Sequence, residues 1–406
     1  MSSFSDPAAL SEALGPHSAV ARAAAECLAA LYQESESLPP VANSFRAWAA
    51  SQPSDGENSP DDFIRHTCLS LLCRLMAYRF LEPLPSERDL WDVISGDYFV
   101  GAGLGNFLGE DFFSWPYFRR SMGIGDDQEG MDAARKLLSA LQAFDFATPP
   151  PGLLSSLYLA YRGEDRISDE EVIPFGMREL ADNPYLTFIA PRCGDGNALA
   201  RCVSAAVDGR QARGEHPMEA LLGVSGQFLS MTSDPLAYVV ASVAFLVSLG
   251  EPAMEPHPPI LIPVYMADFT RVPEGRLETS GQRSYVIDAA DGITLPEQVA
   301  ADPLYLDWLL SRLPNYQRGA ALRLRAQPED LAVQEVLNAW YNYLTSPKAR
   351  TPIPDPLTPA AADVMVEAAR ALIVAYVRGS GPALLHLVRN APAPLFGARR
   401  KFDLTI

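Results

Sequence analysis

The first 150 residues carry apolar side chains at the three-to-four spacing of amphipathic helices. We predict helices over residues 19–32, 60–80 and 131–144, the second beginning at the start signal Ser59-Pro60-Asp61-Asp62. The polar stretch 51–60 is predicted to be a loop, and residues 101–109 a glycine-rich surface connection. The pattern therefore predicts a helical N-terminal domain over residues 1–150.

The pattern changes beyond Pro149-Pro150-Pro151, which marks a candidate domain boundary. A connector over residues 151–185 holds a predicted helix at 153–161 and an acidic turn at 163–171. From Leu186, short apolar runs alternate with amphipathic helices, which is typical of an α/β sheet. The predicted strands are 186–190, 227–231, 260–266, 285–288 and 402–406; the predicted helices are 197–207, 235–249, 304–313, 328–344 and 358–377. A turn-rich segment from Asn390 and the basic triplet Arg399-Arg400-Lys401 lead into the last strand.

Composition restricts the classes of protein that fit this pattern. The 406 residues are 48% apolar, enough for a large core and two domains, and no stretch reaches the ~20 uninterrupted apolar residues of a membrane span. The N-terminus lacks the basic and apolar regions of a signal peptide, so we expect a cytoplasmic protein. Five cysteines without a Cys-x-x-Cys pair predict no metal site. The net charge of −18 argues against a free-standing nucleic-acid binder, because phosphate binding needs clustered Lys and Arg.

A glycine-containing turn after the first predicted strand of the sheet is the first candidate for chemistry. In Thr187-Phe188-Ile189-Ala190-Pro191-Arg192-Cys193-Gly194-Asp195-Gly196-Asn197, an apolar strand runs into a Gly-x-Gly turn and a helix starts at once. Gly194 and Gly196 would let the backbone turn tightly and approach a ligand, and the helix N-terminus offers unpaired N–H groups. The same turn joins strand to helix in many folds that bind nothing there, so both interpretations stay open.

Two aspartates follow the next two predicted strands. Asp234 opens the helix Asp234-Pro235-Leu236-Ala237, and Asp268 follows the apolar run Ile260-Leu261-Ile262-Pro263-Val264-Tyr265-Met266-Ala267. Ligands of open α/β sheets lie at the carboxyl ends of the strands, so Gly194, Asp234 and Asp268 are expected to line one crevice. Alternatively, Asp234 is only a helix N-cap and Asp268 only a loop residue.

The order of these segments resembles the large DNA adenine-N6 methyltransferases of restriction-modification and phage-defence systems. Three segments match that family's first, second and third cofactor motifs: Ala190-Pro191-Arg192-Cys193-Gly194-Asp195-Gly196, Ser230-Met231-Thr232-Ser233-Asp234-Pro235-Leu236-Ala237 and Pro263-Val264-Tyr265-Met266-Ala267-Asp268. The segments 106–115 and 144–146 resemble the preceding helical region, and 387–390 and 401–406 the approach to the catalytic strand. The resemblance implies an α/β fold in which the helical N-terminal domain precedes a partial Rossmann-like methyltransferase sheet over residues 186–406, with a helical insertion at about 304–380.

The resemblance also implies a cofactor site for S-adenosylmethionine. The cofactor-binding residues it implies are Pro191, Cys193, Gly194, Gly196, Thr232 and Asp268, with Asp268 expected at the adenine amino group. Two departures weaken the site: Ala190 stands where the family carries an aspartate, and Thr232 where it carries the carboxylate that holds the ribose. Residues 173–175 occupy the place of the family's Tyr-Thr-Pro element. The Asn-Pro-Pro-Tyr/Trp motif is absent, so no catalytic residue is assigned.

Two functions fit these residues. The first is the N-terminal and cofactor-binding portion of a DNA adenine-N6 methyltransferase, inactive alone, with a partner polypeptide that carries the missing half and supplies the DNA contact. The second is a non-catalytic scaffold of a phage-defence complex. The resemblance predicts strand order 3-2-1-4, with residues 402–406 beside 186–190 and ending where the catalytic loop would begin. An exposed outer edge there would invite association, unless a helix such as 358–377 covers it.

Overall fold

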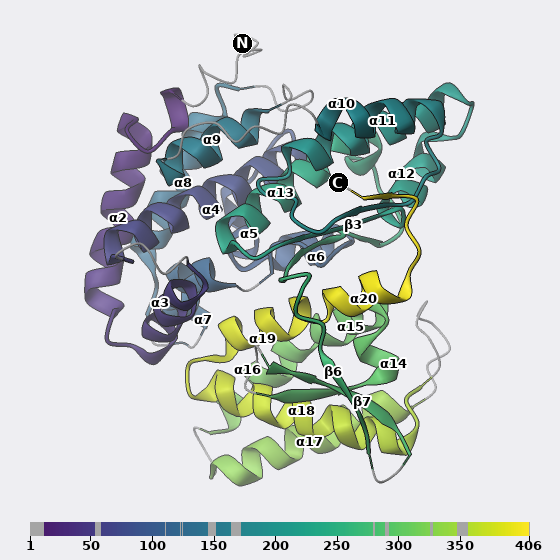
Figure 1. Ribbon diagram of the computed structural model, residues 1–406. Coiled ribbons are helices and arrows are strands. Elements are labelled where there is room, and N and C mark those ends of the chain that lie inside the picture. Colours follow the sequence, from purple (N-terminus) through teal and green to yellow (C-terminus); the bar gives the residue numbers. More distant parts are fainter. Residues whose placement is uncertain are drawn as a thin grey trace.

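The computed structural model describes residues 12–52, 58–109, 111–121, 123, 125–144, 152–163, 172–278, 281–288, 292–324, 328–346 and 356–405. One body contains the N-terminal helices and a four-stranded sheet, and a second lobe with its own small sheet lies beside it (Figure 1). The predicted boundary at Pro149-Pro150-Pro151 and most of the predicted acidic turn lie outside the described residues. No helix in the described parts of the chain is long and apolar enough to cross a membrane.

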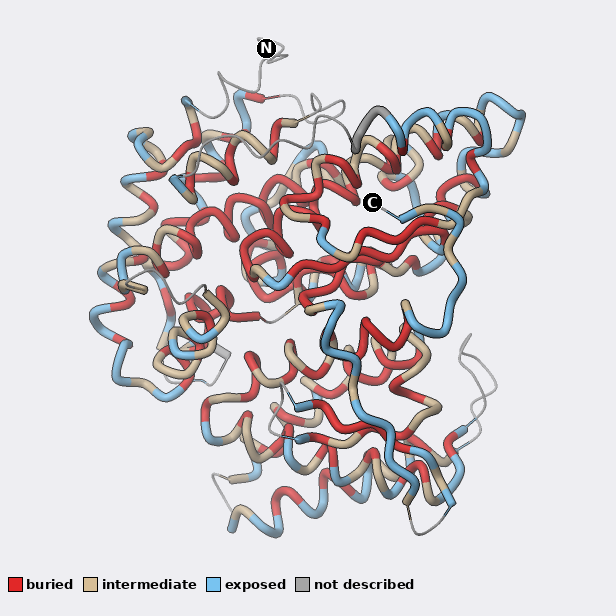
Figure 2. The backbone as a smooth tube through the Cα atoms, viewed as in Figure 1, coloured by how far each residue is buried: buried red, intermediate tan, exposed pale blue. Residues whose placement is uncertain are grey.

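The N-terminal part is helical, as predicted. Its helices are α2 (Ala19–Ser35), α3 (Pro39–Ser51), α4 (Pro60–Leu81), α5 (Leu90–Ser95), α6 (Asp97–Gly101), α7 (Phe118–Ser121) and α8 (Gln128–Leu141). The connector contains the predicted helix, α9 (Leu153–Arg162), and a helix that was not predicted, α10 (Val172–Asp182). Helix α4 begins with a capping box in which Ser59 and Asp62 bond each other's backbone N–H groups. Most of α4 is buried (Figure 2), because α2, α3, α5, α8 and α9 pack around it.

The main sheet has the strand order β5-β3-β2-β9, and each pair of adjacent strands in it is parallel. Its strands are β2 (Phe188–Ala190), β3 (Phe228–Thr232), β5 (Val264–Met266) and β9 (Leu404–Thr405). This order is the predicted 3-2-1-4 order, and the last strand pairs with the first through Phe188 opposite Leu404 and Ile189 opposite Thr405. The chain is therefore a mixed α/β protein with mostly helices and small parallel sheets.

Both faces of this sheet are covered. Phe188, Ala190 and Phe228 point into the core shared with α11 (Asn197–Ala212), α13 (Pro235–Ser248) and the N-terminal helices. Ile189 and Leu229 point to the opposite face, against α20 (Ala393–Arg399). Burial on both sides explains why these strands read as continuous apolar runs rather than as alternating patterns. Helix α12 (Pro217–Ser225) precedes β3 on the α11 side.

The predicted strand 260–266 is wrong as a single element. Pro263 divides it into β4 (Ile260–Leu261) and β5, which belong to different sheets. Strand β4 pairs with β1 (Leu104–Gly105), so the predicted surface connection over 101–109 is also wrong, and Leu104 and Asn106 are buried. The Asn106 amide donates hydrogen bonds to the carbonyls of Ile262 (3.0 Å) and Val264 (2.8 Å), satisfying the backbone on both sides of the proline.

The predicted strand 285–288 is not part of the main sheet. It is β7 (Arg283–Ile287), the central strand of an antiparallel sheet with β6 (Glu274–Leu277) and β8 (Ile293–Pro296). The second lobe therefore begins near Glu274, earlier than the predicted insertion. Its helices are α14 (Glu297–Ala300), α15 (Pro303–Leu310), α16 (Leu313–Arg323), α17 (Glu329–Thr345) and α18 (Pro359–Val377). With this small sheet they share a second apolar core, which continues through α20 to one face of the main sheet.

The return from the lobe to the main sheet also differs from the prediction. Helix α19 (Gly381–Asn390) was not predicted, and the segment after Asn390 that was expected to be turn-rich contains α20; both helices lie between the lobe and the sheet (Figure 1). Helix α18 packs against β8, α17 and α19 within the lobe, so it does not cover β9 as the alternative proposed. Among the described residues, β9 is an edge strand with β2 as its only sheet neighbour.

Candidate functional site

The two glycines of the turn after β2 have different surroundings. Both adopt left-handed backbone angles, with φ of +54° at Gly194 and +79° at Gly196. A Cβ on Gly196 would lie 2.7 Å from the Cα of Ala241, so this glycine lets the start of α11 pack against α13. A Cβ on Gly194 would meet no atom within 4 Å. Only Gly194 therefore leaves open space that a ligand would fill.

Pro191 is half-buried and Cys193 is buried in this turn. The Cys193 N–H donates to the Met231 carbonyl (2.8 Å), which continues the pairing of β2 with β3 beyond the last strand residue. Burial, followed by the nearby Asp195 charge, raises the pKa of the Cys193 thiol to about 12. The thiol is therefore neutral at physiological pH, and we assign it a packing role.

Asp195, between the two glycines, fastens the turn to the N-terminal helices. Its carboxylate is 4% exposed and accepts hydrogen bonds from the Ser155 hydroxyl on α9 and from the Asn197 N–H (3.1 Å). A buried carboxylate with these donors is satisfied by the protein itself. The turn is consequently held in place by a helix that precedes it by some forty residues.

Asp234 is a helix N-cap, which was the structural alternative considered for it. Its carboxylate accepts from the N–H groups of Leu236 (2.7 Å) and Ala237 (3.3 Å) at the start of α13. It also accepts from the Tyr158 hydroxyl (2.9 Å) and lies 3.7 Å from a guanidinium nitrogen of Arg162. Asp234 therefore joins the cap of α13 to α9.

Thr232 lies at the end of β3, in the position implied for the ribose. It is 7% exposed, and its hydroxyl oxygen accepts the Asp234 N–H at 3.4 Å. Its carbonyl accepts the Ala267 N–H (2.9 Å). Thr232 therefore links the end of β3 to the residues that follow β5. Its buried hydroxyl cannot accept hydrogen bonds from both ribose hydroxyls, as a carboxylate would.

Asp268 is the most accessible acidic group of the predicted set, with a side chain 41% exposed. It accepts hydrogen bonds from the Thr270 N–H (3.0 Å) and hydroxyl (2.7 Å), and Arg271 lies 3.4 Å away. The Thr270 hydrogen bonds lower the pKa of the Asp268 carboxyl, and the charges of Arg271 and Arg192 act in the same direction. Asp268 is therefore an ionised acceptor after β5, with Arg192 of the β2 turn in its electrostatic environment.

Parallel pairing places all these residues at one edge of the sheet, as predicted, because Ala190, Thr232 and Met266 end neighbouring strands in the same direction. They do not line one described cavity. A cavity of about 1140 Å³ beside the turn includes Asp195 and Asn197 in its lining but neither Thr232 nor Asp268. In the described residues, no group of three or more His, Cys, Asp and Glu side chains is placed to hold a metal ion.

The sequence interpretation missed the contribution of α9. Ser155, Tyr158 and Arg162 follow one another at spacings of three and four, so they share one face of that helix, and this face bonds Asp195 and Asp234. The spacing is visible in the sequence. The partners are not, because they lie 40 and 76 residues away.

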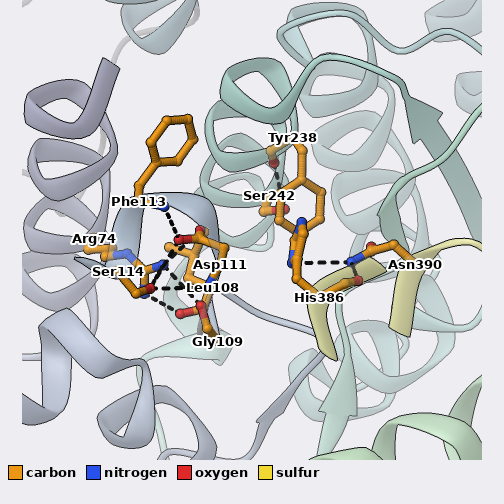
Figure 3. A network of polar contacts seen from close by, with 10 residues as sticks. All are labelled: Arg74, Leu108, Gly109, Asp111, Phe113, Ser114, Tyr238, Ser242, His386 and Asn390. Carbon is orange, nitrogen blue, oxygen red and sulfur yellow. Dashed lines mark hydrogen bonds and ion pairs between the residues drawn. The ribbon is translucent and has the colours of Figure 1, made fainter. Parts of the chain in front are cut away.

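A second polar network, which includes Tyr238 and Ser242 of α13, was also missed (Figure 3). Arg74 of α4 is 1% exposed; it donates to the Asp111 carboxylate (2.8 Å) and to the carbonyls of Leu108 and Gly109. Asn390 accepts from the Met266 N–H (2.9 Å) and so ties α19 to the end of β5. These contacts hold the N-terminal helices and the returning chain against the sheet.

His386 and His66 are buried, and each lies among aromatic rings. The His386 ring lies between those of Phe112 and Tyr238, and the His66 ring is 5.4 Å from that of Trp48. Burial lowers the pKa of each histidine to about 4, although Asp111 and Asp234 respectively act in the opposite direction. Both rings are neutral at physiological pH.

These histidines should make the protein less stable in mild acid. The unfolded chain takes up their protons near pH 6.5, whereas the folded chain resists them down to about pH 4. Stability should therefore fall between these values, by about 1.4 kcal/mol per pH unit for each histidine. Urea unfolding at about pH 7.5 and about pH 5 measures this. His386→Phe keeps a ring between Phe112 and Tyr238 and should flatten the pH dependence; an unchanged slope would contradict the assignment.

Comparison with known proteins adds no relative: no protein-family model, curated protein or solved structure matches this chain. The function is therefore argued from the geometry of the chain itself.

Proposed function

We propose that this chain forms the helical and cofactor-binding part of an S-adenosylmethionine-dependent DNA adenine-N6 methyltransferase, and that it transfers no methyl group by itself. The observation that carries the proposal is the parallel order β5-β3-β2-β9 with an open glycine turn after β2 and acidic residues after β3 and β5. A Rossmann-like sheet uses this edge for its ligand. The proposal accounts for the order of the sheet, the turn and the acidic residues together.

The residues at this edge fit the cofactor in part. Gly194 offers space and backbone where the methionine end would lie, and the ionised Asp268 offers an acceptor for the adenine amino group. Thr232 does not fit the ribose, because its hydroxyl is buried and already accepts the Asp234 N–H. Loss of one buried polar contact costs about 1–3 kcal/mol, which weakens binding about ten- to a hundredfold. We therefore expect weak cofactor binding.

Isothermal titration calorimetry with S-adenosylmethionine tests the proposal. We expect weak binding to the wild-type chain and a further loss of about tenfold in Asp268→Ala, because the adenine acceptor is removed. Asp363→Ala, which removes an exposed carboxylate on α18, should leave the affinity unchanged. No heat of binding at millimolar cofactor, or equal affinities in the two variants, would contradict the proposed site. Methyl transfer to adenine in duplex DNA by this chain alone would contradict the assigned inactivity.

A non-catalytic scaffold is the second candidate. It is favoured because two carboxylates at the candidate site are already bonded by the protein itself. Asp195 and Asp234 are both bonded by α9, and Gly196 packs against α13. Each of these features holds the edge of the sheet rigid without a ligand. The absence of cofactor binding in the calorimetry, with a correctly folded chain, would favour the scaffold.

Both candidates involve a partner polypeptide, and β9 is its proposed point of attachment. Strand β9 presents its outer backbone edge, with Thr405 exposed and Leu404 half-buried. Exposed edges pair with further strands. A partner would also supply the DNA contact that a chain of net charge −18 lacks.

Without its partner the chain should self-associate through this edge. Light scattering should report a mass that rises with concentration, and Thr405→Lys should reduce the association because an edge lysine repels a second strand. Thr294→Lys, at a half-buried position of β8 in the second lobe, is the matched control and should have no effect. A monomeric mass at every concentration would show that the chain does not associate through this edge.

A further inference from the structure

Two aspartates at the carboxyl edge of the main sheet are bonded in the same way. One carboxylate oxygen of each bonds the start of the helix that follows its strand: Asp195 accepts an N–H group of α11, and Asp234 accepts two of α13. The other oxygen of each accepts a hydroxyl of α9, from Ser155 in the first case and from Tyr158 in the second. A single helix therefore holds the starts of two others.

Helix α9 is in turn fixed to the N-terminal helices. The nitrogen of Arg162 that lies 3.7 Å from Asp234 also donates to the side chain of Gln52 (3.0 Å), which ends α3. The Tyr161 hydroxyl donates to the Leu14 carbonyl (3.1 Å), so this residue of α9 bonds the N-terminal part and not the sheet. Helix α9 thus connects the N-terminal helices to both helix starts at the sheet edge.

The turn after β2 depends on these outside contacts for its order. Gly194 and Gly196 both adopt left-handed backbone angles, and glycine loses more conformational freedom on folding than any other residue. Asp195 between them is buried, and so is the Tyr158 side chain that bonds the second aspartate. Breaking a hydrogen bond to a buried carboxylate is costly, because no water takes its place. The bonds from α9 therefore keep both turns in their observed conformation.

We propose that α9 is a positioning element for this edge: its contacts with the turn after β2 and with the start of α13 form and open as one unit. The N-terminal helices would then set how well ordered the candidate site is. Binding at the edge and docking of α9 are linked equilibria, so each stabilises the other. The consequence for S-adenosylmethionine rests on the proposed function, whereas the coupling between α9 and the two turns does not.

Hydrogen–deuterium exchange of the ligand-free chain, followed by mass spectrometry of peptides 191–200 and 232–240, tests the coupling. Tyr158→Phe removes only the hydroxyl that bonds Asp234. We expect exchange at least about tenfold faster in both peptides, because loss of one hydrogen bond to a charged group makes opening more frequent by about this factor. Tyr161→Phe, the matched control, also removes a bonded hydroxyl from a buried tyrosine of α9, and both peptides should exchange as in the wild type.

Ser155→Ala provides the reciprocal test, because it removes the bond to Asp195 and should speed exchange in both peptides as well. Faster exchange in Tyr158→Phe that is confined to peptide 232–240 would overturn the proposal, since the two turns would then open independently. Equal exchange in Tyr158→Phe and Tyr161→Phe would overturn it too. Thermal unfolding should confirm that each variant is folded.

Calorimetry with S-adenosylmethionine separates this proposal from the proposed function. Binding should be weaker in Tyr158→Phe than in the wild type, because the turns must first be ordered, and unchanged in Tyr161→Phe. A wild-type chain that binds no cofactor would contradict the proposed function, while the exchange result alone would still decide whether α9 couples the two turns.

Discussion

Replacing Arg74 with methionine is expected to lower the free energy of unfolding by about 3–5 kcal/mol. Arg74 is 1% exposed, and its removal leaves the Asp111 carboxylate, itself 2% exposed, without its charged partner. The carbonyls of Leu108 and Gly109 lose their donor at the same time. Urea unfolding followed by circular dichroism measures the change, as a lower midpoint with the slope preserved.

Arg65→Met is the matched control for this prediction, because it removes an arginine from the same helix. Arg65 pairs with Asp62 at 2.7 Å, but both side chains are partly exposed, at 42% and 30%. Solvent screens such a pair, so the expected loss is at most about 1 kcal/mol. Equal losses in the two variants would show that the buried network does not stabilise the fold. The double variant Arg74→Met with Asp111→Leu should recover part of the stability lost in Arg74→Met, because no buried charge is left unpaired.

The sequence predicted the main sheet because each of its strands has a local signal. Strands β2, β3 and β5 lie in short apolar runs, and recognisable helix starts follow two of them: the Gly-x-Gly turn before α11 and Asp234-Pro235 at the start of α13. The resemblance then supplied the order of the strands. Strand β6 was missed for a physical reason: every one of its residues is exposed, so it has no apolar alternation to detect.

Elements that depend on distant partners could not be predicted. The segment 101–109 has the composition of a loop, yet its residues 104 and 106–108 are buried, and Asn106 bonds carbonyls more than 150 residues away. Helices α19 and α20 contain Gly381, Pro382, Pro394 and Gly397, which suggest turns, but tertiary packing against the sheet and the lobe holds them helical. At the candidate site, the predicted strand order accounts for the shared edge. The bonds from α9 were not, because they form only in the folded chain.

Alanine substitutions at the two turn glycines should separate an effect on stability, at Gly196, from an effect on cofactor binding, at Gly194. Gly196→Ala is expected to destabilise the fold by about 2–5 kcal/mol, the sum of a left-handed backbone penalty of about 1–2 kcal/mol and overpacking of about 1–3 kcal/mol. The overpacking arises because the new Cβ would meet the backbone of Ala241 at 2.7 Å, and a backbone atom cannot rotate aside. Urea unfolding measures the loss.

Gly194→Ala is the matched variant, two residues earlier in the same turn. It has the same left-handed penalty, about 1–2 kcal/mol, but no clash, because nothing lies within 4 Å of the new Cβ. If the cofactor approaches the open side of the turn, this methyl group enters its space, so binding of S-adenosylmethionine should weaken in Gly194→Ala although the fold survives. A stability loss in Gly194→Ala as large as that in Gly196→Ala would show that the clash with α13 is not what requires Gly196. Unchanged cofactor affinity in Gly194→Ala would remove the turn from the proposed site and leave it a structural junction between β2, α11 and α13.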